Sequence, residues 1–235
     1  MAPMAAYEIA RRAAARRSAP ALHPRGVLCA GRLRVPGTAD ARWGAPWLDR
    51  PGSYAVTARW SRALGLPPRW PDGLGLALRV EDADGAGTAL DLLLTSSGSG
   101  SPGRHLPLLR YDALRGPYST LLAYRAGRRD RVLAAFPAPC EHRRTGASLP
   151  ALRQALARAP LRFDLRAAAA DEPWRTVATL TLTSVSPAPE QATQSFDPYL
   201  HRLPQLHPTG RLSTLREAAC SGSRHGRDAV AGRRS

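Results

Sequence analysis

The sequence predicts an α+β domain that is mainly β, built as an antiparallel β-barrel with peripheral helices. Many short segments alternate apolar and polar residues with the period of two that is typical of strands. Turn signals rich in Gly, Pro and Asp separate these segments. The clearest helical segment comes late in the chain, and this order of strands before helices favours an antiparallel architecture.

Six segments have strand-like patterns. They cover residues 22–33, 54–60, 74–80, 88–96, 161–168 and 177–185. The pattern is clear where Leu74, Leu76 and Leu78 alternate with small or polar residues, because such alternation places all three leucines on one face. The connector 62–73 is rich in Pro and Gly and ends in Asp-Gly, which indicates a turn between two of these strands.

Two segments are expected to be helical. In residues 148–160 leucines recur at helical spacing, Ser148 is the expected N-cap, and Pro160 ends the helix. Residues 211–220 are expected to form a final helix. The pattern of residues 104–147 fits either a helix or strands.

One domain is expected to occupy residues 22–220, since 235 residues suffice to bury a sizeable core. Residues 1–21 form an Ala/Arg-rich leader without a clear apolar face. Its composition fits a basic amphipathic helix, a membrane-surface segment or a disordered extension, and the last of these is expected. The polar, Gly/Arg-rich tail at 221–235 is expected to be disordered as well.

The net charge of +16 would normally point to a nucleic-acid partner. All 34 basic residues are Arg, however, and the chain contains no Lys and no Asn. Such a bias is typical of a GC-rich coding sequence, in which Arg takes the solvated positions that Lys holds elsewhere. Aromatic residues are not interleaved with the arginines as they are in proteins that stack nucleic-acid bases. Nucleic-acid binding is therefore disfavoured.

The cysteines indicate a reducing compartment. Cys29, Cys140 and Cys220 are odd in number, lie far apart, and lack the CxxC or Cys/His spacing of metal sites. A disulfide framework is therefore not expected. The sequence contains no run of about 18 apolar residues that would span a bilayer, and its N-terminus lacks the apolar stretch of a secretory signal. We expect a cytoplasmic protein without a transmembrane segment.

Several motifs occur in a characteristic order. They are "HPRG" (23–26) followed by Gly31, "ARWS" (58–61), "PDGLGLALRV" (71–80), "LDLLLTS" (90–96), "TLTLTS" (179–184) and "SFDPYLHRLPQLHPTGRL" (195–212). In order and spacing they resemble segments of haem catalases, and the short chain resembles the minimal catalase-like haem-binding proteins. The resemblance implies a catalase-like barrel, a haem cofactor, and peroxidase-like or vestigial catalase activity on hydroperoxides.

The resemblance also implies roles for residues on the distal side of the haem. His23 matches the distal histidine, and an imidazole that titrates near neutrality suits the proton transfer of peroxide cleavage. Ser61 would orient His23 through a hydrogen bond. Arg59, one strand period from Ser61, would hold a haem propionate with its fork of donors. Thr95 or Ser96 takes the place of the distal Asn and offers only a hydroxyl.

The proximal ligand departs from the family pattern. Direct alignment of "GRLSTL" (210–215) puts Leu215 at the ligand position, where no atom can bind iron. A second register places Arg216 and Cys220 one helical turn apart, so that the guanidinium favours the thiolate, a known haem ligand. Cys220 is therefore the expected axial ligand to the iron, and an inert buried cysteine is the alternative. Further donors without supporting spacing are His201, His207, Tyr199 and Tyr124.

Two other functions stay open from the sequence. One is a haem-free, degenerate catalase-like barrel that binds a small apolar ligand in a large closed cavity. The other is the disfavoured nucleic-acid-binding protein, whose affinity would fall steeply with salt. On the catalase-like interpretation the partner is a small-molecule peroxide, and the chain is compatible with a homo-oligomer.

Overall fold

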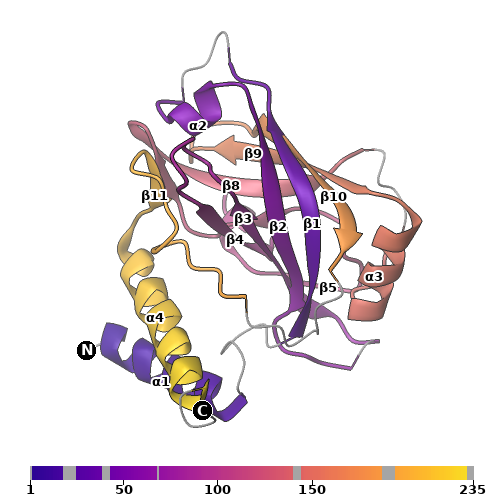
Figure 1. The fold of residues 1–235 in the computed structure, drawn as a ribbon, viewed down its shortest axis with the longest axis vertical. Helices are drawn as coiled ribbons and strands as arrows, with labels where there is room; N and C mark the ends of the chain where they lie inside the picture. Colours follow the sequence, from indigo (N-terminus) through magenta and orange to yellow (C-terminus); the bar gives the residue numbers. More distant parts are fainter. Residues whose placement is uncertain are drawn as a thin grey trace.

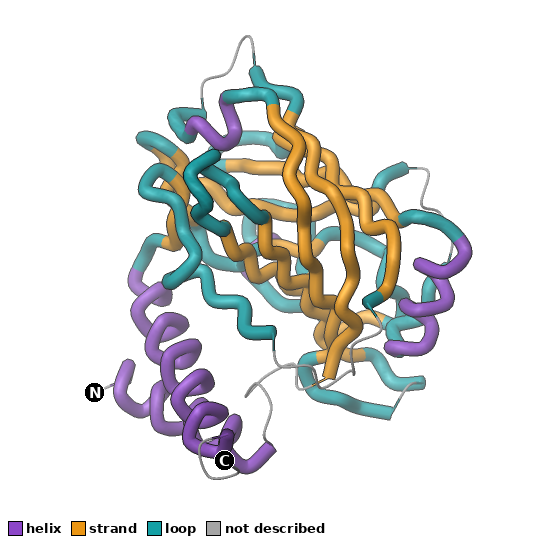
Figure 2. The backbone as a smooth tube through the Cα atoms, in the orientation of Figure 1, coloured by secondary structure: helices purple, strands orange, loops and turns teal. Residues whose placement is uncertain are grey.

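The structure is a computed structural model, which describes residues 2–17, 25–38, 43–67, 69–139, 144–186 and 194–231. Its strands form a barrel, and its helices lie at the periphery (Figure 1, Figure 2). The strands are β1 (Arg25–Val35), β2 (Gly52–Arg62), β3 (Asp72–Val80), β4 (Leu90–Ser96), β5 (Leu109–Arg110), β6 (Tyr118–Ser119), β7 (Tyr124–Ala126), β8 (Arg129–Pro137), β9 (Leu161–Ala168), β10 (Arg175–Val185) and β11 (Leu206–Pro208). The helices are α1 (Ala2–Arg17), α2 (Pro46–Asp49), the 3-10 helix η1 (Gly103–His105), α3 (Leu149–Arg158) and α4 (Arg211–Ala231).

Eight strands close the barrel. They follow one another in the order β1–β2–β3–β4–β6–β8–β9–β10, and β10 pairs back with β1. Every pairing in this ring is antiparallel. The predicted antiparallel barrel and the six predicted strands are therefore confirmed, with residues 22–24 outside the described part of the chain. The undecided segment 104–147 contains most of η1 and the strands β5 to β8.

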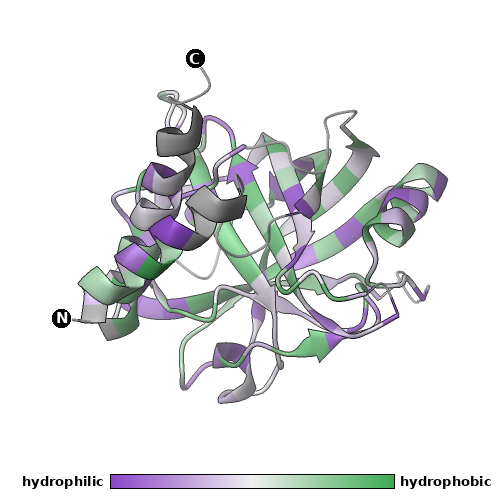
Figure 3. Ribbon diagram, turned by 90° about the horizontal axis from the view of Figure 1, so that it is seen from below, coloured by the Kyte–Doolittle hydropathy of each residue, from purple (hydrophilic) through white to green (hydrophobic). Residues whose placement is uncertain are grey.

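The barrel interior is a packed apolar core. Its residues come from alternate positions along the strands, as the sequence alternation predicts (Figure 3). Within it, Trp60, Tyr118 and Phe163 pack edge to face, with ring centroids 5.8–6.4 Å apart. Trp60 Nε1 donates a hydrogen bond to the Tyr118 hydroxyl, which donates in turn to the carbonyl of Ala113. Because these side chains fill the lumen, the structure differs from the barrel with a large closed cavity that the apolar-ligand alternative predicts.

A buried ion pair shapes the connector between β2 and β3. Arg62 Nε donates to the Asp72 carboxylate over 3.2 Å, and both side chains are buried. The same carboxylate accepts hydrogen bonds from the backbone N–H groups of Leu64 (2.9 Å) and Leu66 (3.2 Å). The Arg62 guanidinium donates onward to the carbonyl of Trp70. The connector thus wraps around one charged pair, which fixes where β3 begins beside β2.

Gly31 permits a close approach between β1 and β10. The register of these two strands shifts between Ala30 and Gly31. A Cβ atom at Gly31 would overlap the carbonyl of Thr181, so a glycine is required at this point. The glycine that follows the "HPRG" motif therefore serves the closure of the barrel.

The two terminal segments form a pair of crossed helices, α1 and α4. A Cβ atom at Gly222 would overlap the backbone of Tyr7, and one at Gly226 would overlap the backbone of Arg11. The Tyr7 hydroxyl lies 2.9 Å from His225 Nδ1. This pair differs from the disordered leader and tail that the composition predicts. The leader lacks an apolar face, but two glycines of α4 allow its backbone to lie directly against the second helix.

The helix α3 agrees with its prediction. Ser148 is the N-cap, and its hydroxyl accepts a hydrogen bond from the N–H of Ala151 over 3.3 Å. α3 packs against β10 and β1, on the other side of the barrel from α1 and α4 (Figure 1). Among the helices that the structure describes, none has the length and apolar character needed to cross a membrane.

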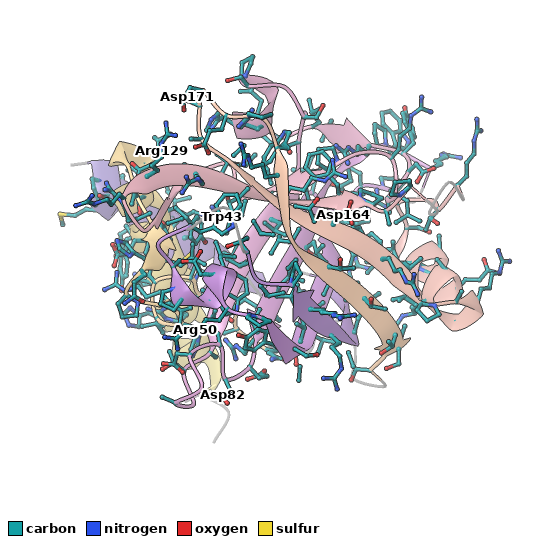
Figure 4. All side chains as sticks on the ribbon, turned by 90° about the horizontal axis from the view of Figure 1, so that it is seen from above. Trp43, Arg50, Asp82, Arg129, Asp164 and Asp171 are labelled. Carbon is teal, nitrogen blue, oxygen red and sulfur yellow. The ribbon has the colours of Figure 1, made fainter. Side chains whose placement is uncertain are left out.

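An ionic network holds the turn between β9 and β10 against β8. Arg129 pairs with Asp171 at 2.8 Å, and the two lie near each other in Figure 4. Arg131 pairs with Glu172 at 3.0 Å, and its guanidinium lies over the ring of Trp43. The turn and the segment before α2 are therefore both tied to the start of β8.

Candidate functional site

Residues singled out by the sequence lie on one outward face of the barrel wall. The register aligns four residues in a row across β1–β4, namely Gly26, Ser61, Gly75 and Thr95. Their chain neighbours Trp60 and Leu94 belong to the core, so the row faces away from it. Because adjacent strands lie about 4.8 Å apart, the backbones of Ser61 and Thr95 are separated by about 10 Å.

Arg59 lies on the same face as Ser61, two positions earlier on β2. Its side chain is buried, and its guanidinium lies against β1, where a Cβ atom at Gly26 would be 2.9 Å from Arg59 Cζ. Gly26 therefore leaves the space that the guanidinium occupies. Gly26, which ends the "HPRG" motif, and Arg59 of the "ARWS" motif thus lie next to each other on the adjacent strands β1 and β2.

The structure separates Thr95 from Ser96. Ser96 is buried on the core side, where its hydroxyl donates to the carbonyl of Leu108 (2.6 Å) and accepts from the N–H of Leu74 (3.0 Å). These bonds brace the start of β3. Thr95 is half-buried on the face that carries Ser61. Of the two hydroxyls, only that of Thr95 is therefore on the same face as Ser61.

His23 lies outside the described residues, so its distal role stays a prediction. β1 begins at Arg25, and the next residue, Gly26, pairs with Ser61. The start of β1 thus lies at the end of β2 that carries Ser61. The predicted hydrogen bond between Ser61 and His23 requires β1 to begin at this end of β2.

The helix α4 contacts the same sheet through Arg216. Arg216 Nη1 donates to the carbonyl of Thr120 over 2.8 Å, and Nη2 donates to the carbonyl of Leu93 over 3.3 Å. Cys220 follows one helical turn later and is half-buried. Leu215 has no atom that binds iron. Arg216, which the second register pairs with Cys220, thus ties α4 to the sheet.

Two tyrosines lie near Arg216 and Cys220. Burial raises the pKa of Tyr124, the charge of Arg216 opposes this rise, and Tyr199 and Cys220 add to it. Burial also raises the pKa of Tyr199, whose hydroxyl donates to the carbonyl of Ser213 over 2.9 Å. Within the described residues, the buried Tyr124 hydroxyl has no hydrogen-bond partner. One guanidinium thus lies among a thiol and two phenols.

This donor set fits a haem on chemical grounds. Thiolate and phenolate are both known axial ligands of haem iron, and a nearby guanidinium stabilises the anionic form of either. The buried guanidinium of Arg59, on the outward face of β2, suits a haem propionate. In the described ranges, no group of three or more His, Cys, Asp and Glu side chains is placed to hold a metal ion. The chemical fit to a haem iron therefore depends on Cys220 as a donor and on Arg216 beside it.

Sequence reasoning missed a buried cluster around Asp91. Arg79 donates two hydrogen bonds to the Asp91 carboxylate, of 2.8 and 2.7 Å, between the paired strands β3 and β4. His201 Nδ1 lies 3.0 Å from this carboxylate, and the backbone N–H of Asp197 donates to it over 2.7 Å. His201, considered as an iron ligand, instead contacts Asp91. The sequence contains one signal for this cluster: Arg79 and Asp91 have opposite charges and lie on either side of the turn that joins β3 to β4.

The Asp91 cluster also fixes the segment that leads into α4. Arg79 donates to the carbonyl of Ser195 over 2.7 Å, and its guanidinium lies over the ring of Phe196. The side chain of Asp197 pairs with Arg224 of α4. One chain of charged contacts therefore runs from β3 and β4 to α4 and sets the position of that helix relative to the sheet.

The two described cysteines are expected to react differently with a thiol reagent such as DTNB. Burial raises the pKa of the Cys29 thiol to about 12, so this residue holds very little thiolate at pH 8. In a Cys140→Ser chain, one thiol should react in the native protein and a second only after denaturation. Adding Cys220→Ser should abolish the native reaction. Rapid modification of both thiols would contradict the burial of Cys29.

Comparisons with known proteins find similar structures but no similar sequences. No protein-family model and no curated protein matches the sequence. Solved structures do match, among them a fungal catalase (TM-score 0.61, 11% identity, 89% of this chain and 58% of that one). A bacterial catalase also matches (TM-score 0.62, 13% identity, 88% of this chain and 56% of that one). The chain thus spans a little over half the length of these catalases. At such low identity the likeness shows the fold alone, and the chain has a catalase-like fold.

Proposed function

We propose that the chain is a haem-binding catalase-like protein with peroxidase-like or vestigial catalase activity on hydroperoxides. The observation that carries this proposal is the hydrogen bond from Arg216 to the carbonyl of Leu93. It holds α4, and with it Cys220, at the sheet whose outward face carries Arg59 and Ser61. On this proposal, the sheet provides the distal side of the haem site and the helix provides the proximal side.

Three side chains would hold the haem. Cys220 would bind the iron as a thiolate, and Arg216 would stabilise its negative charge from one helical turn away. Arg59 would bind a propionate with its planar fork of donors, in a buried position that strengthens the interaction. The haem, when bound, supplies the oxidation and reduction chemistry.

The distal residues would position the peroxide and move its proton. His23 would take the proton from one peroxide oxygen and return it to the other. Ser61 would hold the imidazole in one orientation. Thr95 offers one hydroxyl where an amide would bind the peroxide, so we expect weaker peroxide binding and slower turnover than an amide would support.

Titration of the purified chain with haem tests this proposal. We expect one haem per chain with the Soret absorption of a thiolate-ligated haem. Cys220→Ser should shift that band and weaken haem binding by at least about tenfold, because a hydroxyl is a much poorer iron ligand than a thiolate. Cys140→Ser is the matched control and should change neither property.

Two results would overturn parts of the proposal. The absence of a stoichiometric Soret band would contradict haem binding and leave a catalase-like fold without its cofactor. A band that Cys220→Ser leaves unchanged would contradict Cys220 as the axial ligand. The cytoplasmic location and the homo-oligomer stay predictions from the sequence.

A further inference from the structure

A second candidate site has a lining of its own, next to Ser96 of β4. A surface cavity of about 750 Å³ is bounded by the segment 97–99 that follows β4, the strand β5 and the segments 111–117 and 144–146. Its lining includes three arginines and three large apolar or aromatic side chains, namely Arg110, Arg115, Arg144, Leu108, Leu109 and Tyr111. The residues proposed to hold haem do not line it. A cavity of this size matches the volume of small-molecule sites.

Arg110 is the most constrained of the three arginines. Its Nη2 donates to the carbonyl of Ser97, and its guanidinium lies 5.7 Å from the centre of the Tyr118 ring. Its Nη1 is buried and has no hydrogen-bond partner within the described residues. Gly116, at φ +104, makes room for this arrangement, because a Cβ atom there would lie 2.9 Å from Arg110 Nη2. Because Arg110 lines the cavity, an anion bound there would offset the charge of its guanidinium.

Within the described residues, the positive charge at the cavity is only partly neutralised. In the part of the chain that the structure describes, none of the three arginines forms an ion pair. Asp112 also lines the cavity, but its carboxylate accepts hydrogen bonds from the backbone N–H groups of Leu114 (2.8 Å) and Thr145 (3.3 Å). Three guanidinium groups and one carboxylate leave an excess of positive charge. This excess suits an anionic head group.

Apolar side chains surround the arginines on the protein surface. Leu108, Leu109 and Tyr111 are 44%, 57% and 69% exposed, and Leu106 beside them is 56% exposed. Apolar groups clustered in this way beside a polar site are typical of a surface that binds an apolar part of a ligand. The cavity thus offers cationic groups for a head and leucines for a chain.

We propose that this cavity binds an amphipathic monocarboxylate, a fatty-acid-like molecule whose carboxylate contacts the three arginines and whose alkyl chain packs on the leucines. The guanidinium fork matches a carboxylate in two parallel hydrogen bonds. The proposal is independent of haem binding. It concerns ligand binding only and involves no reaction step.

Calorimetric titration of the full chain with decanoate, without added haem, tests the proposal. We expect one binding site, with 1-decanol and acetate each bound at least about tenfold more weakly, since one lacks the charge and the other lacks the chain. Arg115→Gln combined with Arg144→Gln should weaken decanoate binding about tenfold. Both positions are exposed, so the fold should be retained, with an unchanged midpoint of thermal unfolding as the check.

Further variants separate the head-group and chain contacts. Arg110→Lys should also weaken decanoate binding, because lysine keeps the charge but loses the fork. Leu109→Ser should weaken decanoate binding and leave the weak acetate binding unchanged. Arg34→Gln is the matched control, because Arg34 is exposed at the opposite end of the barrel wall and should not affect decanoate. Cys220→Ser should leave decanoate binding intact, which separates this site from the proposed haem site.

Three outcomes would overturn the proposal. Equal binding of decanoate and 1-decanol would show that the arginines do not recognise the head group. Binding to phosphatidylglycerol vesicles without binding of monomeric decanoate would assign the surface to a membrane. A dimer detected by light scattering that Leu109→Ser dissociates, without decanoate binding, would assign the patch to contact between copies of the chain.

Discussion

Replacing Asp91 by asparagine is expected to lower the free energy of unfolding by about 3 kcal/mol. The Asp91 carboxylate is fully buried and accepts two hydrogen bonds from Arg79, which is itself largely buried. An amide in its place cannot neutralise Arg79. Removing one partner of a buried ion pair leaves an uncompensated charge, which is the costly way to break such a pair.

The Asp91→Asn variant should also weaken haem binding if the proposed site is correct. The carboxylate holds the backbone of Asp197, and Asp197 in turn pairs with Arg224 of α4. The position of Cys220 therefore depends on this chain of contacts. Urea denaturation followed by circular dichroism measures the loss of stability, and haem titration measures the second effect.

Asp130→Asn is the matched control for Asp91→Asn. Asp130 pairs with Arg125 over 2.8 Å, but both side chains are about half exposed. Exposed pairs contribute little, so this variant should change the free energy of unfolding by less than about 1 kcal/mol. Equal effects of the two substitutions would contradict the structural role assigned to the Asp91 cluster.

Strand positions and their inward faces could be predicted from the sequence, because a period of two is a local property. Leu74, Leu76 and Leu78 alternate in the sequence and lie together in the core. The same parity places Arg59 and Ser61 on one outward face. The register that aligns Ser61 with Thr95 could not be predicted, because it depends on non-local contacts.

Several other features depend on contacts that no local pattern reveals. The helix pair of α1 and α4 forms where Gly222 and Gly226 meet the backbone of the leader, although the leader has no apolar stripe that would predict it. The strands β5, β6 and β7 are two or three residues long, which is too short for a recognisable period. The arginine-lined cavity requires Arg110 and Arg144 to meet across more than thirty residues of chain, and the high Arg content hides such a site in the sequence.

The free energy of unfolding is expected to fall steeply above pH 10. Burial raises the pKa of Tyr118 and Tyr124 above that of an exposed tyrosine, so both phenols stay protonated in the folded chain. In the unfolded chain they release their protons near pH 10. The stability that they contribute is therefore complete below about pH 10 and is lost as the pH rises towards their folded pKa. Each tyrosine should lower the free energy of unfolding by about 1.4 kcal/mol per pH unit in this range.

Two matched variants test this pH dependence. Tyr124→Phe removes a hydroxyl that has no hydrogen-bond partner among the described residues, so it should leave stability at pH 7 within about 0.5 kcal/mol and reduce the alkaline slope by about 1.4 kcal/mol per pH unit. Tyr118→Phe should reduce the slope equally but cost about 1–3 kcal/mol at pH 7, because Trp60 Nε1 and the carbonyl of Ala113 each lose a buried partner. Urea denaturation between pH 7 and 11 measures both quantities. An alkaline slope that neither variant changes would mean that other groups, such as Cys29 with its raised pKa, cause the loss of stability.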